Sequence, residues 1–161
     1  MKLDYIQALK RVDEACGAWI LHGQEPLLEQ NVLDAFRHHW KQHEIERQRF
    51  DINNVNEWKN VFNALNSLSL FSNQLAIEVH GNIKPDAQAL KQLKSYLQHN
   101  EQNLLLIVLP KQDSSSLKSA LFQTIEANGV VVALTANYPQ DRQRILKIEA
   151  DKLNIQLAPD A

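Results

Sequence analysis

Unbroken runs of apolar residues, each followed by an amphipathic stretch, are the feature that most constrains the fold. Four of these runs are AWILHG (18–23), QLAIEVH (74–80), NLLLIVL (103–109) and VVVAL (130–134), and RQRFDI (47–52) is a fifth, less apolar candidate strand. A strand that is apolar on both sides requires helices over both faces of its sheet. The alternation therefore predicts a three-layer α/β domain with a parallel five-stranded sheet flanked by helices.

Helical spacing of apolar residues marks the segments between the candidate strands. The helices are expected around 6–12, 26–40, 56–66, 90–97 and 114–129. Pro26 suits the first turn of its helix, where its missing N–H would have no partner in any case. The serines at 114–116 read as helix caps, Leu117 belongs to the apolar face of that helix, and Gly129 ends it.

The composition favours a soluble intracellular protein. A chain of 161 residues that is 44% hydrophobic can bury one sizeable core. Its 17 basic and 19 acidic residues are nearly balanced, and no basic run predicts strong binding of nucleic acid by this chain alone. The single cysteine, Cys16, excludes an internal disulfide and is expected to be a small buried residue. The longest apolar run stops at Pro110, far short of a membrane span, and the N-terminus lacks the apolar stretch of a signal peptide.

The pattern changes near Asn137-Tyr138-Pro139. A further helix is expected over 141–152, and its apolar face has no later partner in the sequence. We therefore expect a second domain to begin here and the sequence to be the N-terminal part of a longer protein.

The loop after the first long strand is where a parallel α/β domain would bind a phosphate. Residues 22–29 hold one glycine, no lysine and no serine or threonine, and Pro26 removes one N–H from the helix start. Glu25 and Glu29 add negative charge where an anion needs positive charge. The sequence predicts no ATP site and no other cofactor.

A metal site is not indicated either. His38, His39 and His43 share one helix, and the last two have the i, i+4 spacing of metal ligands. No cysteine or intervening glutamate completes a set, so a solvated histidine face is the interpretation.

Catalytic chemistry is equally weakly indicated. The acidic residues Asp51, Glu57, Glu78 and Asp86 are too scattered to pair as acid and base, and no Gly-x-Ser-x-Gly motif provides a nucleophile. The residues alone therefore do not indicate an enzyme.

The segment LNSLSLFSNQ carries two adjacent large apolar residues, Leu70 and Phe71, among small polar ones. If the 56–66 helix continued, they would lie about 120° and 220° from Trp58, opposite its apolar stripe. If the helix breaks, they lie in a connection before the next strand. Such a pair either inserts into a pocket on a partner or folds back over the edge of the core, and periodicity alone leaves both alternatives open.

Four segments together carry a resemblance to a known family. They are AWILHGQEPLLEQ, LNSLSLFSNQLAIEV, NLLLIVLPKQ and ILKIEADKLNIQL. Their order and spacing over essentially the whole chain resemble the delta subunits of bacterial DNA polymerase III, the subunits that open the sliding clamp within the clamp loader.

The resemblance implies a domain plan and a binding site. Residues 1–138 would form an AAA+-like domain with a degenerate nucleotide loop, residues 139–161 would begin a helical lid domain, and the C-terminal collar domain would be absent. Family members insert adjacent Leu and Phe side chains into a pocket on the clamp. The matching clamp-binding positions here are Leu70 and Phe71, with Leu68 as an accessory apolar position and Ser69 and Ser72 beside them.

The resemblance also implies the partners. They would be the beta sliding clamp, other clamp-loader subunits through the missing C-terminal region, and primed DNA only as part of the complex. The protein would be cytoplasmic, associated with the nucleoid, and would have no catalytic site of its own. Nucleotidyl transfer and DNA binding would belong to the polymerase holoenzyme. The alternatives are an interaction domain for another protein and a nucleotide-dependent enzyme whose site is not recognised.

Overall fold

The computed structural model describes residues 1–23, 25–66, 74–99, 102–135, 146–147 and 150. Within these residues one parallel sheet has the strand order β1-β6-β2-β5-β4-β3. The strands are β1 (Lys2–Leu3), β2 (Gly17–Gly23), β3 (Glu46–Asp51), β4 (Leu75–His80), β5 (Leu104–Leu109) and β6 (Val130–Leu134).

The parallel α/β fold is confirmed, but the predicted count of five strands is wrong. The described sheet has six strands, because β1 pairs with β6 beyond the five that were expected. A two-residue strand is too short to show any period in sequence, so only its partner reveals it.

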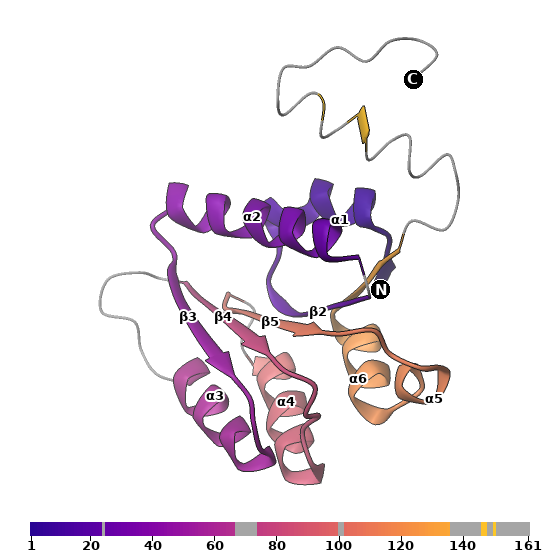
Figure 1. Cartoon of the computed structure of the whole chain (residues 1–161). Helices are drawn as coiled ribbons and strands as arrows, with labels where there is room; N and C mark the ends of the chain where they lie inside the picture. Colours follow the sequence, from indigo (N-terminus) through magenta and orange to yellow (C-terminus); the bar gives the residue numbers. More distant parts are fainter. Residues whose placement is uncertain (24, 67–73, 100–101, 136–145, 148–149, 151–161) are drawn as a thin grey trace.

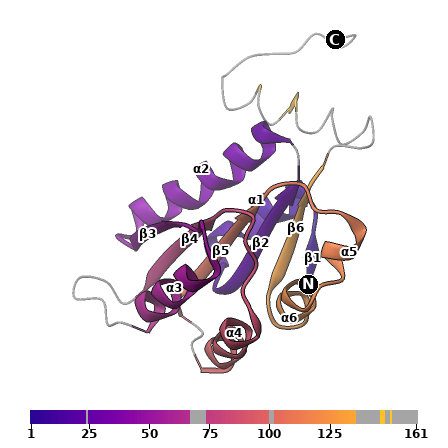
Figure 2. The same ribbon diagram turned by 60° about the horizontal axis from the view of Figure 1, so that its bottom comes forward.

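Helices cover both faces of the sheet, with α1 and α2 on one side and α3, α4 and α6 on the other (Figures 1 and 2). The helices are α1 (Tyr5–Arg11), α2 (Pro26–Gln42), α3 (Trp58–Leu65), α4 (Ala87–His99), α5 (Ser114–Leu117) and α6 (Ala120–Asn128), with short 3₁₀ turns at Val12–Glu14 and Val55–Glu57. Because the strands are parallel, their starts share one edge of the sheet, the amino edge, and their ends share the opposite carboxyl edge.

The core consists of two apolar layers separated by the sheet. Trp19 and Leu21 of β2 belong to the layer that contains Phe36 of α2, whereas Ile20 belongs to the layer on the other face, which contains Phe62 of α3. All six residues of β5 are buried. Each fully buried large side chain contributes roughly 1.5–3 kcal/mol, so the doubly covered centre of the sheet supplies a large share of the stabilisation.

The helix expected over 114–129 is in fact two helices. Asp113, rather than a serine, caps α5: its Oδ1 accepts hydrogen bonds from the Ser116 amide at 2.7 Å and the Ser115 hydroxyl at 2.8 Å. The chain turns at Lys118 and Ser119 before α6 begins, and Leu117 is left 40% exposed instead of joining the apolar face. Gly129 does end α6, as predicted.

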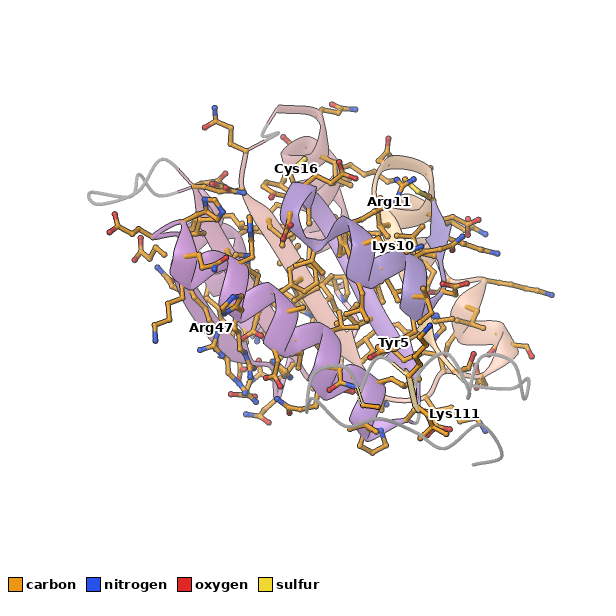
Figure 3. The ribbon with its side chains drawn as sticks, turned by 90° about the horizontal axis from the view of Figure 1, so that it is seen from above. Tyr5, Lys10, Arg11, Cys16, Arg47 and Lys111 are labelled. Carbon is orange, nitrogen blue, oxygen red and sulfur yellow. The ribbon has the colours of Figure 1, made fainter. Side chains whose placement is uncertain are left out.

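Cys16 was expected to be buried, but it is exposed. It lies in the turn that joins the Val12–Glu14 3₁₀ helix to β2, beyond the end of α1 (Figure 3), immediately before Gly17, whose φ is +77°. The buried apolar run of β2 begins only two residues later, at Ala18.

The predicted helix over 141–152 lies outside the described residues apart from positions 146, 147 and 150, so the division into two domains stays a prediction. No helix in the described part of the chain is both apolar enough and long enough to cross a membrane.

Candidate functional site

The predicted clamp-binding residues Leu68, Ser69, Leu70, Phe71 and Ser72 lie outside the described residues. The structure does describe the two places where their segment joins the fold. Helix α3 ends at Leu65 with a turn at Asn66, and β4 begins at Leu75. Both junctions therefore lie at the amino edge of the sheet.

One side chain, that of Asn103, contacts both of these junctions. Its Oδ1 accepts a hydrogen bond from the Leu75 amide at 2.9 Å, and its Nδ2 donates to the Leu65 carbonyl at 3.3 Å. The last carbonyls of a helix have no partner within it, so Asn103 supplies one for α3. Sequence reasoning missed this role because Asn103 belongs to the connection before β5, far from both partners along the chain.

The backbone of Asn103 is held as well. Its carbonyl accepts from the Gly17 amide at 2.8 Å, and the Tyr96 hydroxyl lies 2.8 Å from the same oxygen and 2.9 Å from the Gly17 carbonyl. Burial raises the pKa of Tyr96, so the hydroxyl keeps its proton and remains a donor. The amino edge thus has a fixed point that joins α4, β2 and β5.

Helix α3 leads into the segment with a polar outer face. Trp58, Val61, Phe62 and Leu65 are buried, as the helical wheel predicts, while Lys59, Asn60 and Asn63 are exposed. The Trp58 indole N–H donates to the Ile83 carbonyl at 3.0 Å and fixes the start of the helix. The exposed polar face is therefore free to contact a partner beside the segment.

The loop after β2 lies at the opposite, carboxyl edge, and its described residues do not suit a phosphate. Gly23 packs so tightly on the end of β6 that an added Cβ would lie 2.5 Å from the Leu134 carbonyl oxygen. Pro26 opens α2, and burial raises the pKa of Glu29 in its first turn. Burial also lowers the pKa of His22, whose ring meets Phe122 edge-to-face at 5.4 Å, so this histidine is neutral rather than a cation for an anion.

Glu78, which stood alone in sequence, is fully buried and paired with two arginines. Its carboxylate accepts from Arg37 Nε of α2 at 3.2 Å and from Arg47 Nε of β3 at 2.6 Å. Figure 3 shows Arg47 beside α2. The signal in sequence was a lone carboxylate between the apolar residues Ile77 and Val79, but nothing local pointed to its partners.

The remaining acidic candidates have structural contacts. The Glu57 carboxylate accepts a hydrogen bond from the backbone amide of Asn53 at 3.0 Å. Asp86 Oδ1 accepts one from the backbone amide of Ala89 at 2.9 Å, at the start of α4. Asp51 pairs with Arg49 at 3.1 Å on the edge strand β3. These contacts do not bring any two of the carboxylates together as an acid–base pair.

The histidines of α2 do not assemble a metal site in the described ranges. The rings of His39 and His43 lie 4.5 Å apart, and His39 Nδ1 is 3.4 Å from the Asp13 carboxylate. No group of three or more His, Cys, Asp or Glu residues suited to a metal ion occurs among the residues that the structure covers.

The chain resembles one protein family and several solved structures. The family model for DNA polymerase III, delta subunit, matches residues 19–135, and no curated protein sequence matches. A Bacillus subtilis DNA clamp loader delta protein superposes with a TM-score of 0.67 at 12% identity, over 92% of this chain and 47% of that one.

Two further solved structures share the fold. A DNA polymerase III gamma subunit-related protein of Thermotoga maritima has a TM-score of 0.55 at 14% identity, over 94% of this chain and 53% of that one. A variant of Thermotoga maritima RuvB has a TM-score of 0.51 at 12% identity, over 96% of this chain and 50% of that one. The chain thus spans about half the length of each of these proteins and has the AAA+-like fold of clamp-loader and replication proteins.

Proposed function

The chain belongs to the DNA polymerase III delta subunit family, and from this premise we propose that it binds a sliding clamp and helps to open it for loading onto primed DNA. The observation that carries the proposal is the family match over residues 19–135, which includes the segment with Leu70 and Phe71. In this role the chain is a subunit of the polymerase III assembly, in the cytoplasm, and has no catalytic site of its own. Nucleotidyl transfer and contact with DNA belong to the assembly.

The proposed contact is a two-residue hydrophobic plug, Leu70 and Phe71, that inserts into an apolar pocket of the clamp, with Leu68, Ser69 and Ser72 beside it. Burying a leucine and a phenylalanine contributes roughly 3–6 kcal/mol together, whereas a nanomolar complex needs about 12 kcal/mol net. The plug therefore needs further contacts. The exposed face of α3 with Lys59, Asn60 and Asn63 lies next to the segment in the chain. Among the described residues it is the candidate for these further contacts.

Opening the clamp requires more than binding it. A ligand shifts an equilibrium between two states only by the difference in its affinity for them. We infer that the chain binds the open form of the clamp interface more tightly than the closed form. The loop at residues 22–29 lacks lysine, serine and threonine, so ATP hydrolysis that times this binding belongs to other subunits.

The proposal keeps the expected domain plan: an AAA+-like domain over 1–138 and a lid that begins within 139–161, with loader assembly through a collar domain outside this sequence. These parts concern the timing and assembly of the loader. The clamp-binding step concerns the first domain alone and can be tested directly.

The test is a double variant, Leu70→Ala with Phe71→Ala, assayed for binding to the cognate sliding clamp by surface plasmon resonance. We expect binding to fall at least 100-fold while the thermal midpoint stays within about 2 °C, because the two side chains would act outside the core. The matched control is Leu27→Ala with Leu117→Ala. These leucines are also exposed, at 56% and 40%, but they belong to α2 and α5. The control should bind like the wild type.

Two results would contradict the proposal. Unchanged clamp binding by the Leu70/Phe71 variant would favour a different partner for this domain. A large fall in its thermal midpoint would instead show that both side chains belong to the core.

A further inference from the structure

Asparagine is the side chain that the geometry at the amino edge demands. The Leu65 carbonyl needs a donor and the Leu75 amide needs an acceptor, and Asn103 presents both from one short planar group. Aspartate lacks the donor, leucine lacks both functions, and serine is too short to span two partners. One half-buried residue thus joins the end of α3 to the start of β4.

We propose that Asn103 is a positioning residue for clamp binding. It holds the two ends of the stretch from position 66 to position 74 at a fixed separation and so limits where Leu70 and Phe71 can lie. The inference rests on the proposed function for the importance of these two side chains. The two side-chain hydrogen bonds of Asn103 on which the inference rests join it to described residues, Leu65 and Leu75.

The base on which this side chain acts is rigid. The Asn103 carbonyl is bound by the Gly17 amide and lies next to the Tyr96 hydroxyl, so its backbone cannot shift without disturbing β2 and α4. Leu65, one of the two partners, has a buried side chain in the core layer formed with Phe62. Both junctions are therefore held by one residue, Asn103, whose own backbone is bound to the sheet.

Fixing the ends of a stretch of chain lowers the entropy that is lost when a partner orders it. The cost of closing a flexible stretch is paid on folding rather than on binding, which is the general effect of preorganisation. Loss of this restraint should weaken clamp binding roughly 5- to 30-fold, which corresponds to about 1–2 kcal/mol at 1.4 kcal/mol per tenfold change.

The experiment measures the clamp affinity of Asn103→Leu by surface plasmon resonance, together with its thermal midpoint and the hydrogen exchange of the Leu75 amide. We expect affinity to fall roughly 5- to 30-fold, and exchange at Leu75 to accelerate because its acceptor is lost. Asn103→Ser is measured in parallel, since it keeps a polar group in case the leucine variant does not fold. It should weaken binding to a similar extent.

Tyr5→Phe is the control for general destabilisation. The Asn31 amide donates to the Tyr5 hydroxyl at 3.1 Å in the buried contact between α1 and α2, on the opposite face of the sheet. This variant also loses a buried hydrogen bond and should lower the thermal midpoint, but it should bind the clamp like the wild type.

The possible failures are distinguishable. If a folded Asn103 variant keeps the affinity of the wild type while the Leu70/Phe71 variant loses binding, the positioning role is wrong and the proposed function stands. If Tyr5→Phe weakens binding as much as the Asn103 variants do, the effect is loss of stability and the positioning role is again wrong. If the Leu70/Phe71 variant binds normally, the proposed function itself fails.

Discussion

Replacing Glu78 by glutamine removes the charge at the centre of the buried network between α2, β3 and β4. Both carboxylate oxygens of Glu78 accept hydrogen bonds, Oε1 from Arg37 and Oε2 from Arg47. A glutamine side chain has the same shape, but it must turn its NH₂ group toward one of these arginines. At least one hydrogen bond is then lost, because the glutamine NH₂ group and an arginine N–H group are both donors.

The size of the effect follows from burial on each side of the pair. Removing one partner of a buried ion pair typically costs about 3–5 kcal/mol. Here Glu78 is fully buried, but the side chains of Arg37 and Arg47 are 30% and 37% exposed, so water can partly solvate them once the carboxylate is gone. We therefore expect Glu78→Gln to lose about 2–3 kcal/mol of unfolding free energy, which lowers the thermal midpoint by about 5–10 °C for a domain of this size.

Urea denaturation of Glu78→Gln with an unchanged m-value is the measurement. Glu126→Gln is the matched control, because its carboxylate pairs with Lys2 on the surface, at 3.6 Å, and should cost less than about 0.5 kcal/mol. A triple variant with methionine at 37, 47 and 78 removes the network as a whole and should recover most of the loss. A loss below about 0.5 kcal/mol for Glu78→Gln would refute the reasoning, as would a triple variant no more stable than the single one.

Two further predictions concern the core and the pH dependence. Gly129→Ala should destabilise the fold by roughly 1–3 kcal/mol or more in urea denaturation, because the added Cβ would lie 2.2 Å from the Ala18 carbonyl oxygen. Gly17→Ala, whose Cβ would meet only Leu97 at 3.9 Å, should cost about 1–2 kcal/mol, from its left-handed backbone alone, and a larger loss there would contradict this account. Burial lowers the pKa of His22, so stability is full above the unfolded pKa of about 6.5 and falls as the pH drops below it toward the folded pKa. Denaturation at pH 8 and pH 5.5 should show this slope and a smaller one in His22→Leu, and an unchanged slope would contradict the assignment.

The parallel sheet was predictable because its signal is local and repeated. The run Leu104–Leu109 is apolar throughout, and such a strand needs cover on both faces whatever its neighbours are. The helix from Pro26 was equally clear from its first-turn proline and the i, i+4 stripe that ends at Trp40. The residues of these elements are therefore enough, by themselves, to predict their burial.

The errors concern residues whose environment is not shown by residue type or by periodicity. β1 exists only because β6 pairs with it, and two residues carry no period of their own. Cys16 was assigned by residue type, but the chain is still turning into β2 at that point, and the side chain faces solvent. Leu117 fits a helical face only if α5 and α6 form one helix, and the turn at Lys118 and Ser119 places it outside.

Sequence reasoning likewise predicted one part of the surroundings of the candidate site and missed another. Periodicity correctly predicted the buried stripe of α3, which consists of Trp58, Val61, Phe62 and Leu65. Periodicity could not reveal the role of Asn103, because its contacts to Leu65 and Leu75 arise only when β5 pairs with β4. A binding segment recognised in sequence by its apolar pair would thus depend on a polar residue elsewhere in the chain to hold its ends, and such a residue is found only from the folded neighbours of the segment.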